Sequence, residues 1–215
     1  MTAMRFKYLR TISHPLIQEK LTTMRDRRTP NRDFRQLLSE ISALMVFEMT
    51  QNLPTRSISV ETPLGKNAKG LKLARRLALV PIWRAGLGML EGVHRLIPQA
   101  GVGHIGIYRD EVSLQPVEYY CKLPPNLAEA ETIVLDPMLA TGGSAAHAVT
   151  LCKRAGAKHI SFLCLLAAPE GCERFFAVHP TVPVYTAAFD EGLNSRGYIL
   201  PGLGDAGDRL YGTEK

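Results

Sequence analysis

The sequence predicts an α/β protein with a central, mostly parallel sheet flanked by helices. Two observations lead to this fold class: short apolar runs alternate along the chain with segments of helical periodicity, and several of the runs are continuously apolar. Continuous apolar runs are typical of parallel strands that are covered on both faces. The length of 215 residues favours a single domain spanning 1–215. Alternating strands and helices then require crossover connections.

The individual elements follow in order along the chain. Residues 34–49 place apolar side chains at helical spacing on one face, which predicts a helix. Six apolar runs predict strands, and three periodic stretches between them predict further helices. The strands are expected at 57–60, 77–82, 103–108, 132–136, 159–167 and 182–189, and the helices at 87–97, 144–156 and 170–179.

Two segments depart from this alternation. Residues 108–124 read as a strand, a polar turn and a second strand, which predicts a hairpin arm. The segment 190–215 holds six glycines between Gly192 and Gly212 and little periodicity. Its apolar and aromatic content argues against disorder, so we expect a segment shaped by a ligand.

Composition narrows the class of protein. Hydrophobic residues make up 46% of the chain and charged residues 21%, values typical of globular proteins. The apolar run at 162–168 is far shorter than the roughly 20 residues of a membrane span. The charged N-terminus lacks the apolar core of a secretory signal. We therefore expect a cytoplasmic protein without a membrane partner.

Cysteine spacing and net charge add two expectations. The four cysteines show no paired spacing for zinc or redox chemistry, so they are expected to be reduced packing residues. The histidines likewise lack ligand spacing. The net charge of +6 favours anionic partners, either RNA or a small polyphosphate, without choosing between them.

Two glycine patterns match the spacing of dinucleotide sites but lack the required context. Such a site needs a strand before the glycines and a helix after them. GVGHIG (101–106) lies at the beginning of a predicted strand, and GLGDAG (202–207) is followed by no helical pattern. We therefore do not expect a nicotinamide or flavin site.

The segment 131–149 has the order strand, glycine-rich loop, helix. Backbone N–H groups of Ala140–Ser144 can converge on one anion, because glycines allow close approach and the helix contributes its positive end. Asp136 lies too near this anion to bind it and suits neighbouring hydroxyls, a combination that a sugar phosphate supplies. No lysine follows Gly143, unlike in a nucleoside-triphosphate loop. A capped helix after an ordinary turn is the alternative.

Two arginines follow predicted strands. Arg84 leaves the 77–82 strand, where its guanidinium can grip phosphate oxygens, although a surface arginine paired with a carboxylate is an equal alternative. Arg109 would be a second cation on the same edge if the strands are parallel. Together with the helix N-terminus they suggest more than one phosphate group. Trp83 is expected to pack.

The stretch 25–35 holds five arginines and two aspartates. We expect a solvated entry to the following helix, with Asn31 or Asp33 near the cap. Arg25 could instead face an effector or a subunit contact.

The motif VLDPMLATGGSA (134–145) resembles the phosphoribosyl-pyrophosphate (PRPP) motif of type I phosphoribosyltransferases, in the form of the uracil phosphoribosyltransferase family. The resemblance covers nearly the whole chain and implies the type I fold, with a C-terminal hood over 190–215. It also implies transfer of ribose 5-phosphate from PRPP to N1 of uracil, giving UMP and diphosphate in pyrimidine salvage. Further matches occur in order at 21–29, 61–65, 84–89, 102–110, 116–124 and 198–213.

The resemblance implies a role for each site residue. Asp136 would bind the ribose hydroxyls, and Arg84 and Arg109 the pyrophosphate. Asp205 would lie near PRPP and its Mg²⁺, which PRPP and water would hold without direct side-chain ligation. The catalytic set is Asp136, Arg84, Arg109 and Asp205; PRPP would contact these and Pro137, Met138, Leu139, Ala140, Thr141, Gly142, Gly143 and Ser144, and uracil would contact Ile199, Gly204, Asp205 and Ala206.

Partners and departures complete the expectations. Some relatives are activated by GTP, and a homodimer or higher homo-oligomer is expected. The alternatives on this fold are an RNA-binding pyrimidine regulator and a transferase for another base; the intact hood and arginines argue against the regulator, so nucleic acid is not an expected partner. The chain departs from the common pattern at Leu135, Trp83 and the turn 111–115.

Overall fold

The computed structural model describes residues 5–109 and 116–213. Its centre is a nine-stranded sheet with the main order β1-β11-β10-β8-β4-β6-β7, to which β5 adds beside β4 and β9 beside β10. The pairings in this sheet are parallel apart from β6 with β7. The predicted fold class is thus confirmed. The bounds are β1 (Leu9–Thr11), β4 (Arg76–Trp83), β5 (Gly101–Val102), β6 (His104–Arg109), β7 (Pro116–Lys122), β8 (Ala130–Leu135), β9 (Met138–Leu139), β10 (His159–Ala167) and β11 (Val184–Phe189).

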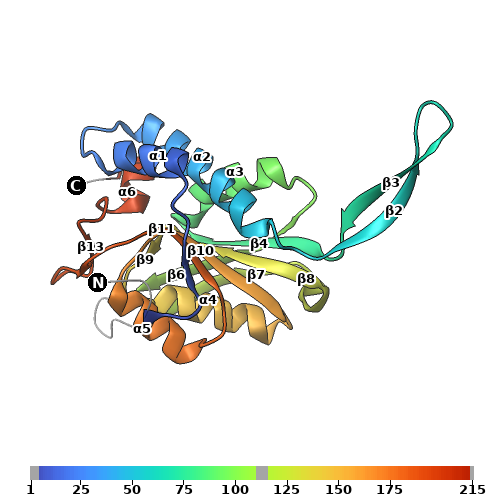
Figure 1. The fold of residues 1–215 in the computed structure, drawn as a ribbon. Helices are drawn as coiled ribbons and strands as arrows, with labels where there is room; N and C mark the ends of the chain where they lie inside the picture. The colour runs from blue at the N-terminus through green and yellow to red at the C-terminus, as the bar shows by residue number, and fades with distance from the viewer. Residues whose placement is uncertain (1–4, 110–115, 214–215) are drawn as a thin grey trace.

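Helices cover both faces of the sheet (Figure 1). The first three helices lie over one face, and the next two lie over the other. The four helices predicted from periodicity are confirmed as α2 to α5, while α1 and β1 were not predicted. The bounds are α1 (Pro15–Arg25), α2 (Asn31–Thr50), α3 (Gly86–Leu96), α4 (Gly143–Arg154) and α5 (Pro169–Val178), with a short 3₁₀ turn η2 (Leu127–Glu129).

The core consists of two apolar clusters, one on each side of the sheet. Along β4, Leu79 packs into the cluster with α2 and α3, whereas its neighbour Val80 packs into the cluster with α4 and α5. In β10, Leu163 and Phe162 divide in the same way. Both faces of each central strand are therefore buried from solvent, which explains why these strands are continuously apolar in sequence.

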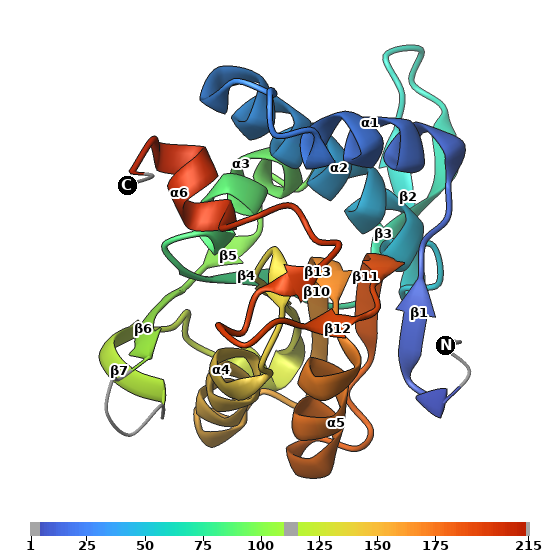
Figure 2. The same cartoon turned by 90° about the vertical axis from the view of Figure 1, so that its left-hand side faces the viewer.

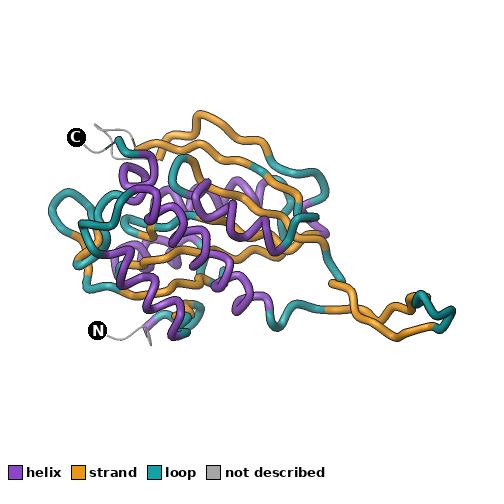
Figure 3. The backbone as a smooth tube through the Cα atoms, turned by 90° about the horizontal axis from the view of Figure 1, so that it is seen from above, coloured by secondary structure: helices purple, strands orange, loops and turns teal. Residues whose placement is uncertain are grey.

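One predicted strand belongs elsewhere. Residues 57–60 lie in β2 (Thr55–Glu61), which pairs antiparallel with β3 (Asn67–Leu73) in a separate two-stranded sheet. This hairpin extends away from the body of the molecule (Figures 1 and 3). Placing 57–60 among the parallel strands was wrong, because β2 is largely exposed along its length. Its partner β3 was not predicted, since lysines and glycine interrupt its apolar pattern.

The predicted hairpin at 108–124 corresponds to the antiparallel pair β6 and β7. The turn 111–115 lies outside the described residues. The pair sits at the edge of the main sheet, beyond β4. It therefore extends the sheet next to β4, the strand that Arg84 follows.

The C-terminal segment forms β12 (Gly192–Leu193), β13 (Ile199–Leu200) and the short helix α6 (Ala206–Tyr211). Contrary to the sequence reading, a helix does begin within GLGDAG. Six residues are too few to show periodicity, and the start is set by the Asp205 side chain, which accepts from the N–H of Asp208 at 2.9 Å. Within the described residues, the preceding strand β13 pairs with β12 in a separate two-stranded sheet, which differs from the strand of a dinucleotide site.

Two expectations concern local features. Helix α2 begins at Asn31 with Pro30 as its N-cap, so Asn31 and Asp33 lie in the first turn, near the cap as predicted. Cys152, Cys164 and Cys172 are buried and free, as expected of packing residues, but Cys121 is exposed. Within the described ranges, no helix has the length and apolar character needed to cross a bilayer.

Candidate active site

The candidate site lies at the carboxyl ends of β4 and β8. These strands are parallel neighbours, so the residues that follow them emerge at the same edge of the sheet. Arg84 follows β4, and Asp136 follows β8. Figure 2 looks onto this edge and shows β12 and β13 passing in front of the central strands, with α6 beside α3. The fold thus brings the glycine-rich loop that follows β8 and the described part of the C-terminal hood (190–213) together.

The loop between β8 and α4 is anchored by its backbone to β10. Pro137 accepts from the N–H groups of Leu165 and Leu166 at 3.0 and 3.1 Å, and the N–H of Asp136 donates to Leu163 at 3.2 Å. These hydrogen bonds fix the beginning of the loop, and the end of the loop leads into helix α4.

The N-terminus of α4 has the features of an anion site. Its N-cap residue is Gly142 at φ 76°, which provides no side chain to cap the first N–H groups. A Cβ atom at Gly142 would lie 2.4 Å from the carbonyl oxygen of Gly171, so the close approach of α5 admits only glycine here. Arg174 of α5 also lies nearby, since a Cβ atom at Gly143 would be 3.4 Å from its guanidinium carbon.

Asp136 is the first residue after β8 and is partly buried. Burial raises its pKa to about 7; the backbone N–H of Met138 lowers the pKa, and the neighbouring Asp205 carboxylate raises it. A carboxyl group in this setting is poised between its two protonation states near neutral pH. Donors such as sugar hydroxyls would favour the charged form.

A cavity of about 230 Å³ joins the two halves of the site. Its volume suits a ligand smaller than a typical drug-sized molecule. Residues expected to bind PRPP and residues expected to bind uracil line it together. The lining consists of Ala85, Asp136, Met138, Ala140, Gly197, Tyr198, Ile199, Gly204, Asp205, Ala206 and Gly207.

Arg84 lies beside the hood helix. Its guanidinium is 3.3 Å from the carboxylate of Asp208 and 5.9 Å from the ring centroid of Tyr211, whose hydroxyl donates to the Arg84 carbonyl at 3.1 Å. The side chain is mostly exposed, so a ligand at this edge can reach it. Asp208 and Tyr211 were not singled out from sequence, because nothing local marks them as neighbours of Arg84.

Trp83 packs as expected. Its ring stacks on Tyr120 of β7 with centroids 4.9 Å apart, and its Nε1 donates to Nδ1 of His104 at 3.0 Å. This packing ties the end of β4 to the β6–β7 pair. The backbone of Arg109 ends β6, while its side chain lies outside the described part of the structure.

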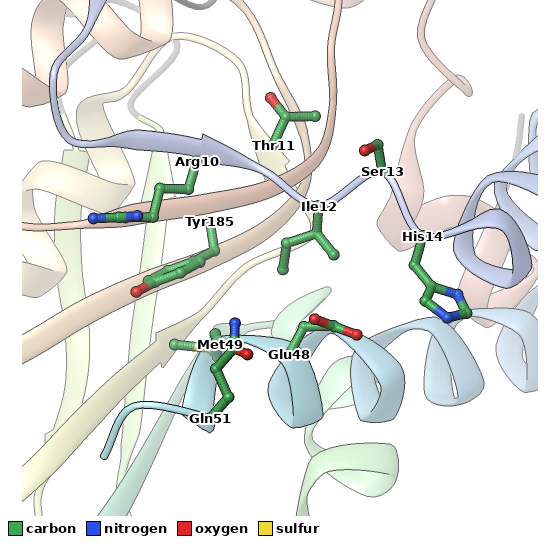
Figure 4. A pocket seen from close by; sticks show the side chains of 9 residues that line it. All are labelled: Arg10, Thr11, Ile12, Ser13, His14, Glu48, Met49, Gln51 and Tyr185. Atoms are coloured by element: carbon green, nitrogen blue, oxygen red, sulfur yellow. The ribbon is translucent and has the colours of Figure 1, made fainter. Parts of the chain in front are cut away.

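A larger cavity of about 570 Å³ lies between β1 and the C-terminal end of α2 (Figure 4). Its size does not make it the better candidate, because its lining includes none of the predicted site residues. The residues that line this cavity are Arg10, Thr11, Ile12, Ser13, His14, Glu48, Met49, Gln51 and Tyr185. In the described residues, no three His, Cys, Asp or Glu side chains are grouped so that they could hold a metal ion.

The chain is similar to known proteins along nearly its whole length. Residues 11–213 match the family model described as uracil phosphoribosyltransferase. The uracil phosphoribosyltransferase of Clostridium perfringens is 57% identical over 203 residues, covering 94% of this chain and 97% of that protein. The enzyme of the same name from Dictyoglomus turgidum is 57% identical over 204 residues, covering 94% and 98%.

Solved structures agree on the fold. A protein from Aquifex aeolicus superposes with a TM-score of 0.89 at 37% identity, covering 94% of this chain and 97% of its own. A hypoxanthine-guanine phosphoribosyltransferase from Bacillus anthracis has a TM-score of 0.50 at 12% identity, covering 74% of this chain and 80% of its own. At that identity the likeness concerns the fold alone.

Proposed function

The chain belongs to the uracil phosphoribosyltransferase family, and we propose that the cavity under its hood is where uracil meets the ribose of PRPP. The protein is a pentosyl-transferring enzyme that converts uracil and PRPP to UMP and diphosphate. One observation carries the assignment of the site: Asp136 and the hood residues Ile199 and Asp205 line the same small cavity. The relatives offer no support for an RNA-binding regulator or for a transferase of another base.

The loop 136–144 is proposed to hold the ribose 5-phosphate. This phosphate does not react, so backbone N–H groups and the positive end of α4 suffice to bind it. Thr141 and Ser144 add hydroxyl donors. This division of labour explains the absence of the lysine that a triphosphate loop carries next to a reacting phosphate.

Departure of pyrophosphate is the step that needs cations. As the bond to the leaving group breaks, positive charge grows at the ribose C1 and negative charge grows on the pyrophosphate. Arg84 and Arg109 are proposed to stabilise the leaving group. Asp136 is proposed to orient the ribose by accepting from its hydroxyls.

Mg²⁺ is the proposed cofactor. The carboxylates of Asp136 and Asp205 line the cavity, and hard oxygen donors of this kind fit the ion. PRPP and water would supply most of its ligands, with Asp205 nearby. When bound, the ion would neutralise charge on the pyrophosphate.

The glycine-rich hood is proposed to select the base. Backbone N–H and C=O groups at Ile199, Gly204 and Ala206 can match the acceptor, donor and acceptor along one edge of uracil. Cytosine presents a donor in place of one acceptor, which would leave a buried group unpaired.

The test is an assay of the purified protein with PRPP, Mg²⁺ and each of uracil, cytosine, hypoxanthine, adenine and orotate. Uracil is expected to yield UMP and diphosphate, with little product from the other bases. Product from a different base, or RNA binding without UMP formation, would contradict the proposal.

Arg84→Ala is expected to raise the KM for PRPP by about tenfold or more, with a smaller effect on the KM for uracil. The reason is the loss of a charge-assisted contact to the pyrophosphate, of the kind worth about 1.5–3 kcal/mol. Steady-state kinetics with each substrate varied in turn measures the effect. Arg95→Ala, which removes another exposed arginine paired with a carboxylate, serves as the control. An effect confined to uracil would remove Arg84 from its role.

A homo-oligomer is also proposed, and the β2–β3 hairpin supports it. In this hairpin, Leu64 is 87% exposed and Leu71 is 71% exposed. An isolated two-stranded hairpin is only marginally stable in water. A second copy of the chain would cover these side chains. This supporting hairpin is not the one at 108–124 that suggested the oligomer from sequence.

Replacing Leu64 and Leu71 together by aspartate is expected to shift the protein toward monomer, because two charges cannot be buried in an apolar contact without a large cost. Sedimentation velocity measures the mass. Glu61→Gln on the same hairpin is the control. An unchanged mass would show that the hairpin does not carry the interface.

Activation by GTP and a cytoplasmic location complete the proposal. The net charge of +6 supports binding of a polyanion such as GTP. UMP formation with and without GTP tests it directly. The four free cysteines support a reducing compartment.

A further inference from the structure

Arg25, the last residue of α1, contacts the hood rather than solvent. Its Nη1 and Nη2 atoms donate to the two carboxylate oxygens of Asp190 at 2.7 and 2.6 Å. Nη1 also donates to the carbonyl oxygen of Gly202 at 2.7 Å. Arg25 is therefore not a freely solvated residue at the entry to α2, because its guanidinium makes contacts within the chain.

The same ion pair holds both sides of Gly202. While Arg25 binds its carbonyl, the N–H of Gly202 donates to Oδ2 of Asp190 at 3.0 Å. The Asp190 side chain is 6% exposed and that of Arg25 is 24% exposed. A bidentate, buried pair fixes geometry more strictly than a solvated one, since removing either partner leaves a charge without compensation.

Gly202 connects the two stretches of hood that line the cavity, residues 197–199 and 204–207. It has φ 59°, and a Cβ atom there would lie 2.0 Å from the carbonyl oxygen of Ile199. The Gly202 corner is thus pressed against one of the residues proposed to bind uracil. A shift of this corner would move both walls of the cavity.

The neighbouring carbonyl is held in a similar way. Arg209 donates to the carbonyl oxygens of Leu203 and Met24 at 2.9 and 2.7 Å, and its guanidinium lies 4.4 Å from the ring centroid of Phe34. Two successive hood carbonyls are therefore connected by arginines to the C-terminal end of α1. The contact through Arg25 includes the ion pair with Asp190, which conservative substitutions can probe without removing the packing of Arg209 on Phe34.

We propose that Arg25 and Asp190 are positioning residues for uracil: they fix the Gly202 corner and so set the spacing between Ile199 and the 204–207 wall of the base pocket. This inference rests on the proposed function of the same cavity. It predicts a defect that concerns mainly the base, because the Gly202 corner lies between Ile199 and Gly204, whereas the backbone of Asp136 and Pro137 is anchored separately to β10.

The test uses Arg25→Lys and Asp190→Asn in the full-length protein, with uracil and PRPP varied separately. A lysine ammonium lacks the planar fork that reaches all three acceptor oxygens of Asp190 and Gly202, and an asparagine at 190 keeps one oxygen but loses the ion pair. Each variant is expected to raise the KM for uracil by about ten- to a hundredfold, as loss of a charge-assisted hydrogen bond does, and to change the KM for PRPP by less than about threefold. Arg28→Lys is the matched control, because it alters the exposed pair with Asp26 close by in the chain.

The outcomes separate this inference from the proposed function. If the wild-type protein forms no UMP from uracil and PRPP, the proposed function itself fails. If the wild type is active and both variants keep the wild-type KM for uracil, the positioning role is overturned. Equal increases in both KM values, accompanied by a lower Tm, would show a merely structural role and would overturn it as well.

Discussion

Asp136→Asn is expected to lower kcat/KM for PRPP by about a hundredfold while the protein stays folded. The asparagine amide keeps one acceptor but presents a donor to the second ribose hydroxyl, so one charge-assisted hydrogen bond worth about 1.5–3 kcal/mol is lost. The KM for uracil is expected to change less. Steady-state kinetics and circular dichroism on the same preparation measure both effects. Wild-type kinetics in this variant would remove Asp136 from its role.

The pH dependence supplies an independent signature of Asp136. Because burial raises its pKa from 3.8 to about 7, the charged acceptor form predominates only above neutral pH. The kcat/KM for PRPP of the wild type is therefore expected to rise as the pH increases through about 7. The asparagine variant should lack this rise. A flat wild-type profile in that range would contradict the pKa assignment.

Stability should change in the opposite direction. A carboxyl group whose pKa is raised on folding contributes its full stability below the unfolded pKa of 3.8 and loses it as the pH rises through the folded value of about 7. Relative to wild type, Asp136→Asn is thus expected to be more stable at about pH 8 than at about pH 4. Denaturant unfolding at the two pH values measures the difference. If the variant and the wild type differ by the same free energy of unfolding at both pH values, the prediction is contradicted.

Deletion of residues 199–215 is expected to abolish UMP formation altogether. From sequence, the loss of the hood should remove uracil binding and leave some PRPP binding, unless the segment is needed for folding. The structure favours the second outcome, because Ile199, Leu203 and Leu210 are buried in the main core. Losing the burial of three such side chains costs about 5–9 kcal/mol, comparable to the whole stability of a typical domain. The truncated protein is expected to lose its cooperative unfolding transition, seen by circular dichroism, and with it PRPP binding by calorimetry.

A point substitution separates base binding from folding. Gly204→Ala places a methyl group where the nearest described atom is Cδ of Arg209 at 3.6 Å, so the core is not disturbed. The cost is the positive φ of 81°, about 1 kcal/mol for a non-glycine residue. This variant is expected to keep PRPP binding and weaken uracil binding. Native structure and PRPP binding in the deletion variant would instead restore the expectation from sequence.

Much of the fold could be predicted because its signals are local. Helices α2 to α5 show an apolar face, and the strands between them are buried on both sides, so each pattern reports its own surroundings. The strand at 57–60 was misplaced because a local pattern does not show where a strand lies in the fold. A short polar-apolar strand that projects from the body carries no signal that distinguishes it from a strand at the edge of a sheet.

The candidate site divides in the same way. Asp136 and the glycines at 142 and 143 belong to one continuous motif, and chemistry alone points to an anion there. The neighbours of Arg84 could not be predicted, since Asp208 is 124 positions away in the chain. Helix α6 was missed because six residues do not establish a period.

The sequence by itself determined the alternation of central strands with helices α2 to α5, the glycine-rich loop after β8 and the family that the chain resembles, because these depend on neighbouring residues and on motif spacing. Only the tertiary structure decided which side of each strand faces which helix layer, and that Arg25 binds Asp190 across 165 positions. It also decided that the hood is part of the core rather than a detachable cover. Contacts between distant segments depend on how the whole chain packs, and local periodicity contains no record of that packing.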